Sequence, residues 1–531
     1  MSVRGSAAVG AGLAPAREAR PIREGERIHV VGAAGAGASA AALLAAWAGA
    51  SVDGCDPGGA SPYTPPLLAE GIRVADAHDA AHLRAGVLPA PERLAVTKAL
   101  TAIDPDNAEL AAARGAGIPL EPWQQVVADA AARRTLVAVA GTHGKSTTSG
   151  WLVGVLAAGG ADPGAFVGAL LPAAVTGIGL AATARRGAGS AFVVEADEYA
   201  GNFDAYRPAI AVLTSAEWDH PDVFEDRAAV IAAFEAWIRR AGSTAGPEGP
   251  GAPPVLVANV ADEGVAELAG RLADWPGRIV ATALVDVAPQ RLGGYARGMG
   301  ERFHTAAGPA SALLGRITAA DRDATTLEIA GLDPLAGPVA ARLATAGRHN
   351  AANALGVAGA AAALGLGPGA ITDGLAGFRG VGRRLERKGE AHGVVVYDDY
   401  GHHPTAIRET LAAIRQREPG RRIWAVYEPL TYHRTAALLD AFADVLAGAD
   451  AVAIADIWAG RDPDTTIASA AGLAEAVARR APRIPVAAPG TVEATARWLA
   501  SEVRSGDAVL VMGGGRSYRI GELLLEHLEA G

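Results

Sequence analysis

The sequence predicts an α/β protein of three domains: a Rossmann-like N-terminal domain, a central parallel sheet of the P-loop ATPase type, and a Rossmann-like C-terminal domain. Short apolar runs that fit buried strands alternate with alanine-rich helical stretches. Several of these runs end in glycine or acidic residues, which is typical of the carboxyl edge of a parallel sheet. The length of 531 residues also suits about three domains.

The first residues, 1–25, mix Arg, Gly, Ala and Pro and contain no apolar segment of the kind that a signal peptide needs. We therefore expect a disordered tail there. The domain limits predicted after the tail are 26–132, 133–379 and 380–531.

A βαβ unit opens the first domain. The apolar run 28–32 predicts a strand, and the glycine turn that follows contains Gly35 and Gly37. A helical stretch at 38–49 and a second strand at 51–56 complete the unit. Such a turn lets the backbone approach a nucleotide phosphate. Because its G-x-x-G-x-G order departs from G-x-G-x-x-G, an NAD-dependent oxidoreductase is only an alternative interpretation.

The strongest functional signal is the segment 137–148, where an apolar run leads through G-T-H-G-K-S-T-T into a helix start. Glycines on both sides of the turn let backbone N–H groups face an anion, and the helix N-terminus adds partial positive charge. Lys145 can reach nucleotide phosphates, and the Ser146 hydroxyl can hold Mg²⁺. The predicted phosphate loop consists of Gly141, Thr142, His143, Gly144, Lys145, Ser146 and Thr147.

An ordinary glycine-rich turn is the alternative for this loop, which is one residue shorter than G-x-x-x-x-G-K-[ST]. Lysine usage argues against that alternative. The chain has 47 Lys and Arg residues together, yet lysine occurs only at positions 98, 145 and 388. A compact ammonium group retained at position 145 suits a phosphate.

Acidic and histidine side chains follow the next two predicted strands. The strand at 191–198 ends in three acids, and the strand at 210–215 leads to His220. Carboxylate oxygens are hard ligands that suit Mg²⁺, so Glu195 is a candidate metal ligand. His220 is a second candidate because acids flank it. The alternatives are a solvated strand-end acid and a structural histidine.

A second doubly wound sheet is predicted in the C-terminal domain from apolar runs at 394–399, 424–427, 451–454 and 508–511. Two segments of the central domain, 242–254 and 285–310, have the composition of loops. The sequence therefore predicts two parallel sheets after the first domain, with their functional residues at the carboxyl edges.

Composition limits the partners and the compartment. A net charge of −10 argues against nucleic acid as the main partner. Cys55 is the only cysteine, which excludes an internal disulfide framework and fits a reducing cytoplasm. No unbroken run of 18 apolar residues occurs, so we expect no membrane span. Monomer and homodimer both stay open.

Six motifs together resemble the Mur ligases, the ATP-dependent amino-acid ligases of peptidoglycan precursor synthesis. They are the first glycine turn, the phosphate loop, E-A-D-E at 195–198, E-W-D-H at 217–220, G-R-H-N-A-A-N-A at 347–354 and D-D-Y-G-H-H-P-T at 398–405. The resemblance covers nearly everything after the tail. It implies ATP and Mg²⁺ as cofactors and acyl activation as the chemistry, in which ATP phosphorylates a carboxylate and an amine then displaces the phosphate.

The resemblance also implies roles for single residues. The implied catalytic residues are Lys145, His220, Arg384, Asp399 and His403. The implied ATP site adds Asn350, Asn353 and Arg384 to the phosphate loop, and the implied metal ligands are Ser146, Glu195 and His220. The implied substrate contacts are Gly35, Gly37, His78, Thr101 and Arg434. Helix capping is the alternative for Asn350, and loop polarity is the alternative for His78 and Thr101. An inactive nucleotide-binding regulator would be expected to lack Lys145, Glu195 or His220, and all three are present.

Within the family, the glycine turn, D-D-Y-G-H-H-P and the Arg-Thr pair at 434–435 most resemble the members that join L-alanine to UDP-N-acetylmuramate. E-A-D-E-Y also resembles the members that recycle a cell-wall tripeptide, which are the alternative. Glu428, Leu430 and Arg516 stand where the family usually has Gln, His and Asp. If the charge of Glu428 faces the site, it disfavours a substrate with further carboxylates, such as the tripeptide.

Overall fold

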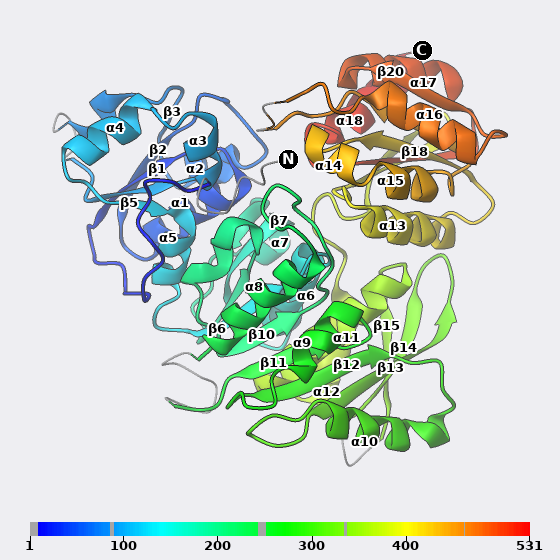
Figure 1. Cartoon of the computed structure of the whole chain (residues 1–531), viewed down its shortest axis with the longest axis horizontal. Coiled ribbons are helices and arrows are strands. Elements are labelled where there is room, and N and C mark those ends of the chain that lie inside the picture. Colours follow the sequence, from blue (N-terminus) through cyan, green and yellow to red (C-terminus); the bar gives the residue numbers. More distant parts are fainter. Residues whose placement is uncertain are drawn as a thin grey trace.

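The computed structural model describes residues 9–84, 90–242, 251–333, 337–460, 462 and 464–530. The described chain forms three sheets in sequence order, each flanked by helices (Figure 1). The first part, in blue, and the last part, in yellow to red, both adjoin the central part, in cyan and green (Figure 1). The predicted α/β class with three successive sheets is confirmed.

The first sheet is fully parallel, with the order β3-β2-β1-β4-β5. Its elements are β1 (Arg27–Val31), α1 (Ala36–Trp47), β2 (Ser51–Cys55), α2 (Thr64–Ala69), β3 (Val74–Ala75), the 3₁₀ helix η2 (Ala80–Leu83), β4 (Arg93–Val96), α3 (Lys98–Ile103), α4 (Ala108–Gly115), β5 (Leu120–Pro122) and α5 (Trp123–Ala130). This is the strand order of a Rossmann fold without its sixth strand, and it places the β1–α1 turn at the carboxyl edge.

The expectation of a disordered tail is not met over residues 9–25, which lie against the first domain. Arg17 donates hydrogen bonds to Glu121 at 2.8 Å and to Asp129 at 2.7 Å. The Ala14 N–H donates to the Leu120 carbonyl at 2.7 Å. Ion pairs and backbone hydrogen bonds hold this segment in place. Order of this kind leaves no apolar periodicity in the sequence, which is why the sequence did not predict it. Residues 1–8 lie outside the described residues.

The second sheet has the order β15-β14-β13-β12-β11-β10-β6-β9-β7-β8. Its elements are β6 (Thr135–Ala140), α6 (Lys145–Ala158), β7 (Gly164–Leu171), α7 (Ala173–Thr176), β8 (Ala182–Arg185), β9 (Ala191–Glu195), β10 (Ile210–Leu213), α8 (Arg227–Arg239), β11 (Val255–Asn259), α9 (Glu263–Gly270), β12 (Arg278–Leu284), α10 (Leu292–Arg302), β13 (Ser311–Ala320), β14 (Thr325–Ala330), β15 (Val339–Leu343), α11 (Arg348–Ala363) and α12 (Pro368–Gly377). Alternate residues of β6 pack on opposite faces: Val137 lies with α6 and α11, whereas Ala138 lies with α8 and α9.

Two details of this central part differ from the sequence prediction. The sheet is parallel only in its interior, because β8, β14 and β15 pair antiparallel with their neighbours. The segment 285–310, expected to be loop-like, contains α10. Four glycines hide this helix in the sequence because they lower helix propensity, but burial of Leu292 and Met299 stabilises it. Most of the other expected loop, 242–254, lies outside the described residues.

The third sheet has the order β16-β17-β21-β18-β19-β20 and is parallel except for β16. Its elements are β16 (Glu386–Ala391), β17 (Val394–Asp399), α13 (Pro404–Arg417), β18 (Arg422–Glu428), α14 (Tyr432–Ala437), α15 (Leu439–Leu446), β19 (Ala451–Ala455), α16 (Ala470–Arg480), β20 (Val486–Gly490), α17 (Val492–Glu502), β21 (Asp507–Gly513) and α18 (Tyr518–Ala530). Helices α13, α15 and α16 cover one face, and α17 and α18 cover the other.

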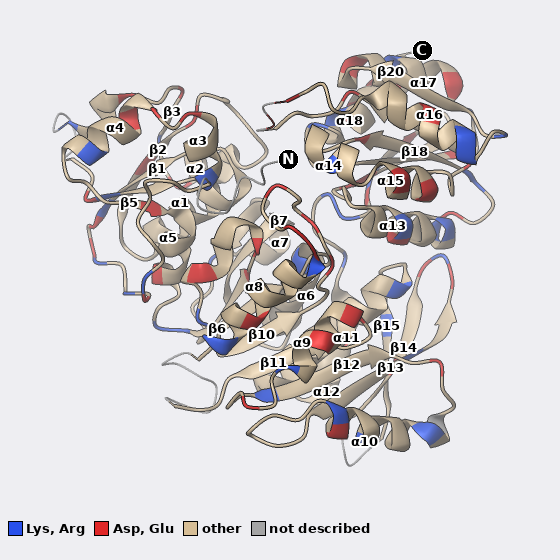
Figure 2. Cartoon of the chain, viewed as in Figure 1, with Lys and Arg blue, Asp and Glu red and all other residues tan. Residues whose placement is uncertain are grey.

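Basic and acidic residues are interspersed on the helices of all three parts (Figure 2). None of the helices in the described part of the chain is both long and apolar enough to cross a bilayer. The domain limits at 26–132, 133–379 and 380–531 stay predictions, and the change of sheet near each limit supports them.

Candidate active site

The phosphate loop connects β6 to α6 with a backbone that requires glycine at both ends. Gly141 has φ +131° and Gly144 has φ +80°, conformations that other residues rarely adopt. A Cβ atom on Gly141 would lie 2.2 Å from the Thr214 hydroxyl oxygen. Helix α6 begins directly after the loop, so its free N–H groups and positive dipole end face the same space.

Lys145 is held inside the loop by carboxylates. Its Nζ donates to Glu198 Oε2 at 2.8 Å and to the Gly141 carbonyl at 2.7 Å. Burial alone would lower the pKa of Lys145, but the charges of Glu198 and Asp197 raise it. The side chain is therefore a fixed ammonium group at neutral pH.

Ser146 joins a candidate metal ligand to a residue from the start of the C-terminal domain. Its hydroxyl donates to Glu195 Oε1 at 3.0 Å and accepts from an Arg384 NH2 group at 2.8 Å. The other carboxylate oxygen of Glu195 accepts from the Gly168 N–H at 2.7 Å. The structure thus brings together three predicted site residues that are 238 positions apart at their extremes.

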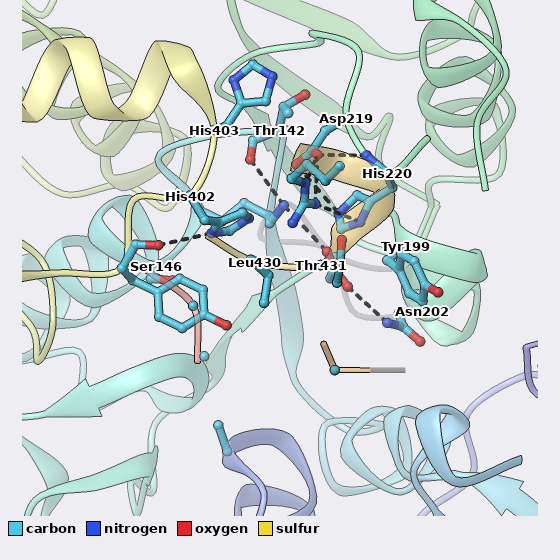
Figure 3. Close-up of a pocket in the computed structure, with 18 of the residues that line it drawn as sticks. Thr142, Ser146, Tyr199, Asn202, Asp219, His220, His402, His403, Leu430 and Thr431 are labelled. Carbon is cyan, nitrogen blue, oxygen red and sulfur yellow. Dashed lines mark hydrogen bonds and ion pairs between the residues drawn. The ribbon is translucent and has the colours of Figure 1, made fainter. Parts of the chain in front are cut away.

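His220 follows β10 in a left-handed conformation, with φ +55°. The Arg434 NH2 group lies 3.2 Å from His220 Nδ1, and the Arg434 Nε donates to Asp219 Oδ1 at 2.9 Å. Figure 3 shows Asp219 and His220 beside each other. Burial would raise the pKa of Asp219, but the Arg434 charge holds it well below its ordinary value. This buried pair links the central and C-terminal parts.

The ligand atoms of His220 lie within 4.8 Å of the carboxylates of Asp197 and Glu198. Of the three acids that end this strand, only Glu195 was predicted as a metal ligand, since a local sequence does not tell which of these side chains point inward. A second group of the same kind, at the same edge of the sheet, consists of His143, Glu217 and His403. Both groups border the phosphate loop.

The second group also joins the two parts of the chain. The Thr405 hydroxyl donates to Glu217 Oε2 at 2.7 Å, and His403 Nε2 lies 3.3 Å from the Trp218 carbonyl. Burial would raise the pKa of Glu217, but His143 and Thr405 lower it to about 2. Burial lowers the pKa of His403 to about 4, so this imidazole is neutral at pH 7.

The side chains of Asp399, Asn350 and Asn353 line a cavity, and Asp399 and Asn350 also bind main-chain groups. Asp399 accepts from the Leu385 N–H at 2.8 Å and the Gly401 N–H at 2.7 Å. Asn350 donates to the Ala346 carbonyl at 2.7 Å and accepts from Asn353 at 3.3 Å. The cap of α11 is Gly347, so the capping alternative for Asn350 does not apply.

Two cavities meet at the phosphate loop. One of about 360 Å³ is lined by Thr147, Asn350, Asn353 and Asp399, and one of about 590 Å³ is lined by Gly37, Lys145, Ser146, Glu195, His220 and Arg434. Four residues border both cavities: His143, Gly144, Arg384 and Ala406. The larger cavity therefore reaches all three parts of the chain, and Arg384 stands between the two.

His78 and Thr101 do not line either cavity, although both were assigned to substrate contacts. Thr101 accepts from the Gly10 N–H at 2.8 Å and donates to the Lys98 carbonyl at 2.9 Å. His78 Nδ1 lies 3.1 Å from the Cys55 sulfur. The family resemblance suggested a substrate contact for both side chains, and loop polarity was the alternative. Both have partners within the protein, and their substrate roles stay predictions. Gly35 is the N-cap of α1, next to the lining residues Ala36 and Gly37.

The residues that the sequence did not predict form hydrogen bonds between the central and C-terminal domains. Thr405 was quoted only as part of a motif, and Glu217 and Asp219 only as acids near His220. Their partners are 188 and 215 positions away, so no local spacing could reveal them. The sequence does show that polar residues follow the ends of neighbouring strands. This predicts that they lie at the same edge of a sheet, but not which of them pair across domains.

Together, the fold and the site define a three-domain α/β protein of the nucleotide-binding class, with a phosphate loop that borders two cavities. Three family models match it in turn: the Mur ligase family catalytic domain at 27–135, the Mur ligase middle domain at 139–361 and the Mur ligase glutamate ligase domain at 383–515. The chain belongs to the Mur ligase family.

Curated relatives support the same family over nearly the whole chain. A UDP-N-acetylmuramate–L-alanine ligase of Frankia casuarinae is 35% identical, covering 95% of this chain and 98% of the relative. The enzyme of that name from Kineococcus radiotolerans is 37% identical, covering 94% and 96%. This family leaves the NAD-dependent oxidoreductase without support.

Solved structures share the fold. The UDP-N-acetylmuramate–alanine ligase of Thermotoga maritima has a TM-score of 0.70 at 21% identity, covering 95% of this chain and 99% of that one. A murein peptide ligase of Psychrobacter arcticus has a TM-score of 0.67 at 24% identity, with the same coverage. The two resemblances are close in strength, so the fold by itself does not separate the two activities.

Proposed function

We propose that the protein is an ATP-dependent ligase that joins L-alanine to the carboxylate of UDP-N-acetylmuramate, releasing ADP and phosphate. The observation that carries the proposal is the phosphate loop between two cavities, with Lys145, Ser146 and Arg384 at the junction. The names of the curated relatives supply the substrates.

The smaller cavity suits the nucleotide. The amide groups of Asn350 and Asn353 line it together with the loop residues Gly144 and Thr147. Asn353 lies against the loop, because a Cβ on Gly144 would be 2.7 Å from its Oδ1. Phosphates that enter the loop would meet the Lys145 ammonium and the N-terminus of α6. In this arrangement the terminal phosphate points toward the larger cavity.

The larger cavity suits the acceptor and the amino acid. Gly37 of the first glycine turn borders it from one side, and Arg434 borders it from the C-terminal side. A carboxylate of the muramyl group between them would attack the γ-phosphorus, with ADP as the leaving group. The alanine amine would then attack the acyl-phosphate carbon, lose a proton and expel phosphate. The protein's main contributions are positioning and neutralisation of charge.

Mg²⁺ fits the oxygen ligands of this site. The Ser146 hydroxyl and Glu195 carboxylate lie 3.0 Å apart, and hard oxygen donors are those Mg²⁺ prefers. His220, Asp197 and Glu198 form a further group that could hold a second ion. When bound, the metal would neutralise the charge of the transferred phosphoryl group.

We expect Glu195→Gln to raise the Mg²⁺ concentration needed for half-maximal phosphate release by about tenfold or more. The change replaces one carboxylate oxygen with an amide NH2 group and keeps the size of the side chain. The amide oxygen can still accept from the Gly168 N–H, and the NH2 group can donate to the Ser146 hydroxyl. The measurement is a Mg²⁺ titration at saturating ATP. Glu328→Gln on β14, whose carboxylate pairs with Arg316, is the matched control. Overlapping titrations of Glu195→Gln and wild type would remove Glu195 from the metal site.

Two of the sequence departures can now be placed. Leu430 lines the larger cavity, whereas Glu428 does not. The Glu428 carboxylate lies beneath the turn after β21, because a Cβ on Gly515 would be 2.8 Å from its Oε2. Burial raises its pKa to about 7. The hypothesis that its charge repels a tripeptide from the site is therefore not supported by this geometry, and selectivity rests on the cavity itself.

The substrate panel tests the proposal directly. Phosphate release from ATP is measured with UDP-N-acetylmuramate and, in turn, L-alanine, glycine, L-serine or the cell-wall tripeptide. We expect the highest kcat/KM with L-alanine and only background release without UDP-N-acetylmuramate. The highest kcat/KM with the tripeptide would identify the recycling activity instead. We also propose a cytoplasmic location and a monomeric or dimeric state. The single cysteine, Cys55, is buried and unpaired, which supports the cytoplasmic location.

A further inference from the structure

A buried cluster of metal-type ligands lies in the first domain, outside both cavities. It consists of His29 on β1, Cys55 at the end of β2, His82 on η2 and Glu109 in the first turn of α4. Cys55 and Glu109 are fully buried, and His29 is 2% exposed. None of the four lines the larger or the smaller cavity. The ligase chemistry proposed above uses none of them.

The ligand atoms of the four residues lie within 4.8 Å of one another. Glu109 Oε1 lies 2.9 Å from His29 Nε2 and 3.0 Å from His82 Nδ1. The Cys55 sulfur lies 3.2 Å from Glu109 Oε2 and 3.4 Å from His29 Nε2. Ligands of a tetrahedral ion with bonds of about 2.1 Å are separated by about 3.4 Å, so small shifts would admit such an ion.

We propose that His29, Cys55, His82 and Glu109 form a binding site for a borderline-soft divalent cation of the Zn²⁺ type. Thiolate, imidazole and carboxylate together are the donors that Zn²⁺ takes in proteins, whereas Mg²⁺ prefers oxygen alone. Four protein ligands leave no open position, which is the arrangement of a structural site. The ion would join β1, β2, η2 and α4 into one unit.

The surroundings of the cluster fit this role. Asp53 Oδ1 lies 2.7 Å from His29 Nδ1, the ring nitrogen that does not face the cluster. A carboxylate on the outer nitrogen of a ligating histidine fixes the ring and strengthens the ligand. His82 is 23% exposed, so an ion could enter from its side. His78 borders the cluster through contacts with Cys55 and Glu109.

Cobalt substitution tests the site because Cys55 is the only cysteine of the chain. Untagged, metal-free protein is titrated with Co²⁺ and its absorption recorded. We expect one equivalent to produce the strong visible bands of tetrahedral cobalt together with a near-ultraviolet thiolate-to-cobalt band. Zn²⁺ should then bleach both. The two clusters at the phosphate loop contain no sulfur, so the thiolate band reports only this site.

Variants assign the ligands. Cys55→Ser should lose the thiolate band, and His82→Ala should weaken Co²⁺ binding by at least tenfold. Asp53→Asn should weaken it by about 10–100-fold, as expected for loss of an outer carboxylate. His527→Ala on α18 is the matched control and should bind like wild type. Circular dichroism checks that each variant is folded.

The wild-type spectrum decides the proposal even if a variant fails to fold. Absence of a thiolate band at one equivalent of Co²⁺ would show that the cluster is only a hydrogen-bonded network around Glu109. Retention of the band in Cys55→Ser, or equal affinity in His82→Ala and wild type, would also overturn it. The titration needs no ATP or sugar nucleotide, so its outcome is independent of the proposed ligase activity.

Discussion

Lys145→Ala is expected to abolish phosphate release from ATP while the protein stays folded. The ammonium group lies at the start of α6, where the nucleotide phosphates are proposed to bind, and its charge is fixed at neutral pH. Loss of one preorganised electrostatic contact typically costs about 2.7–4 kcal/mol in the transition state, or about 10²–10³-fold in kcat. The measurement is steady-state phosphate release with saturating ATP, UDP-N-acetylmuramate and L-alanine.

The local cost of this substitution needs a separate control. Lys145 is the cation that faces Glu198, whose side chain is 2% exposed, so its removal leaves a buried carboxylate unpaired. The double variant Lys145→Ala/Glu198→Gln removes that charge. If the double variant regains activity, the loss came from a distorted loop and not from a missing phosphate contact. Lys388→Ala, which disrupts only a pair with Glu386, should keep wild-type turnover.

The sequence was most informative where a local pattern carries the structure. The apolar run at 394–399 coincides with β17, and the phosphate loop lies between a strand and a helix as predicted. Both signals depend on residues within one turn or one strand. The helix α10 was missed for the opposite reason, because its glycines carry a weak local signal and packing stabilises it.

Contacts between distant segments were beyond what the sequence could predict. Single strand ends gave Glu195 and His220 as candidates, and the family resemblance gave Arg384. The pairing of Arg434 with Asp219, however, depends on how two sheets are docked. The same holds for Cys55, which was read only as a sign of a reducing compartment. Its three partners come from separate elements that only the folded first domain brings together.

Arg434 is the residue for which the structure changes the prediction most. The resemblance assigns it to the carboxylate of the amino acid, and it does line the larger cavity. It is nevertheless only 3% exposed, and its guanidinium is already paired with Asp219 at 2.7 Å. Arg434 could therefore bind the amino acid directly or act as a positioning residue that holds Asp219 and His220. The two roles have different kinetic consequences.

We expect Arg434→Lys to raise the KM for L-alanine by about tenfold or more, because lysine keeps the charge but not the planar fork. The KM is measured for L-alanine and for L-alaninamide, which lacks the carboxylate, in wild type and in Arg434→Lys. If Arg434 binds the carboxylate, the substitution should raise only the KM for L-alanine. Asp219→Asn, which leaves the guanidinium in place, is the matched variant for the positioning role.

A positioning role gives another pattern. Arg434→Lys and Asp219→Asn would then both lower kcat, with little change in either KM, because the buried link between the central and C-terminal parts would be weakened in each. An equal rise in the KM for L-alanine and L-alaninamide would likewise contradict carboxylate binding. Arg434, Asp219 and His220 meet beside the proposed phosphoryl-transfer site. A loss of kcat in both variants would therefore show that the Arg434–Asp219 pair completes the active site when the C-terminal sheet docks against the central one.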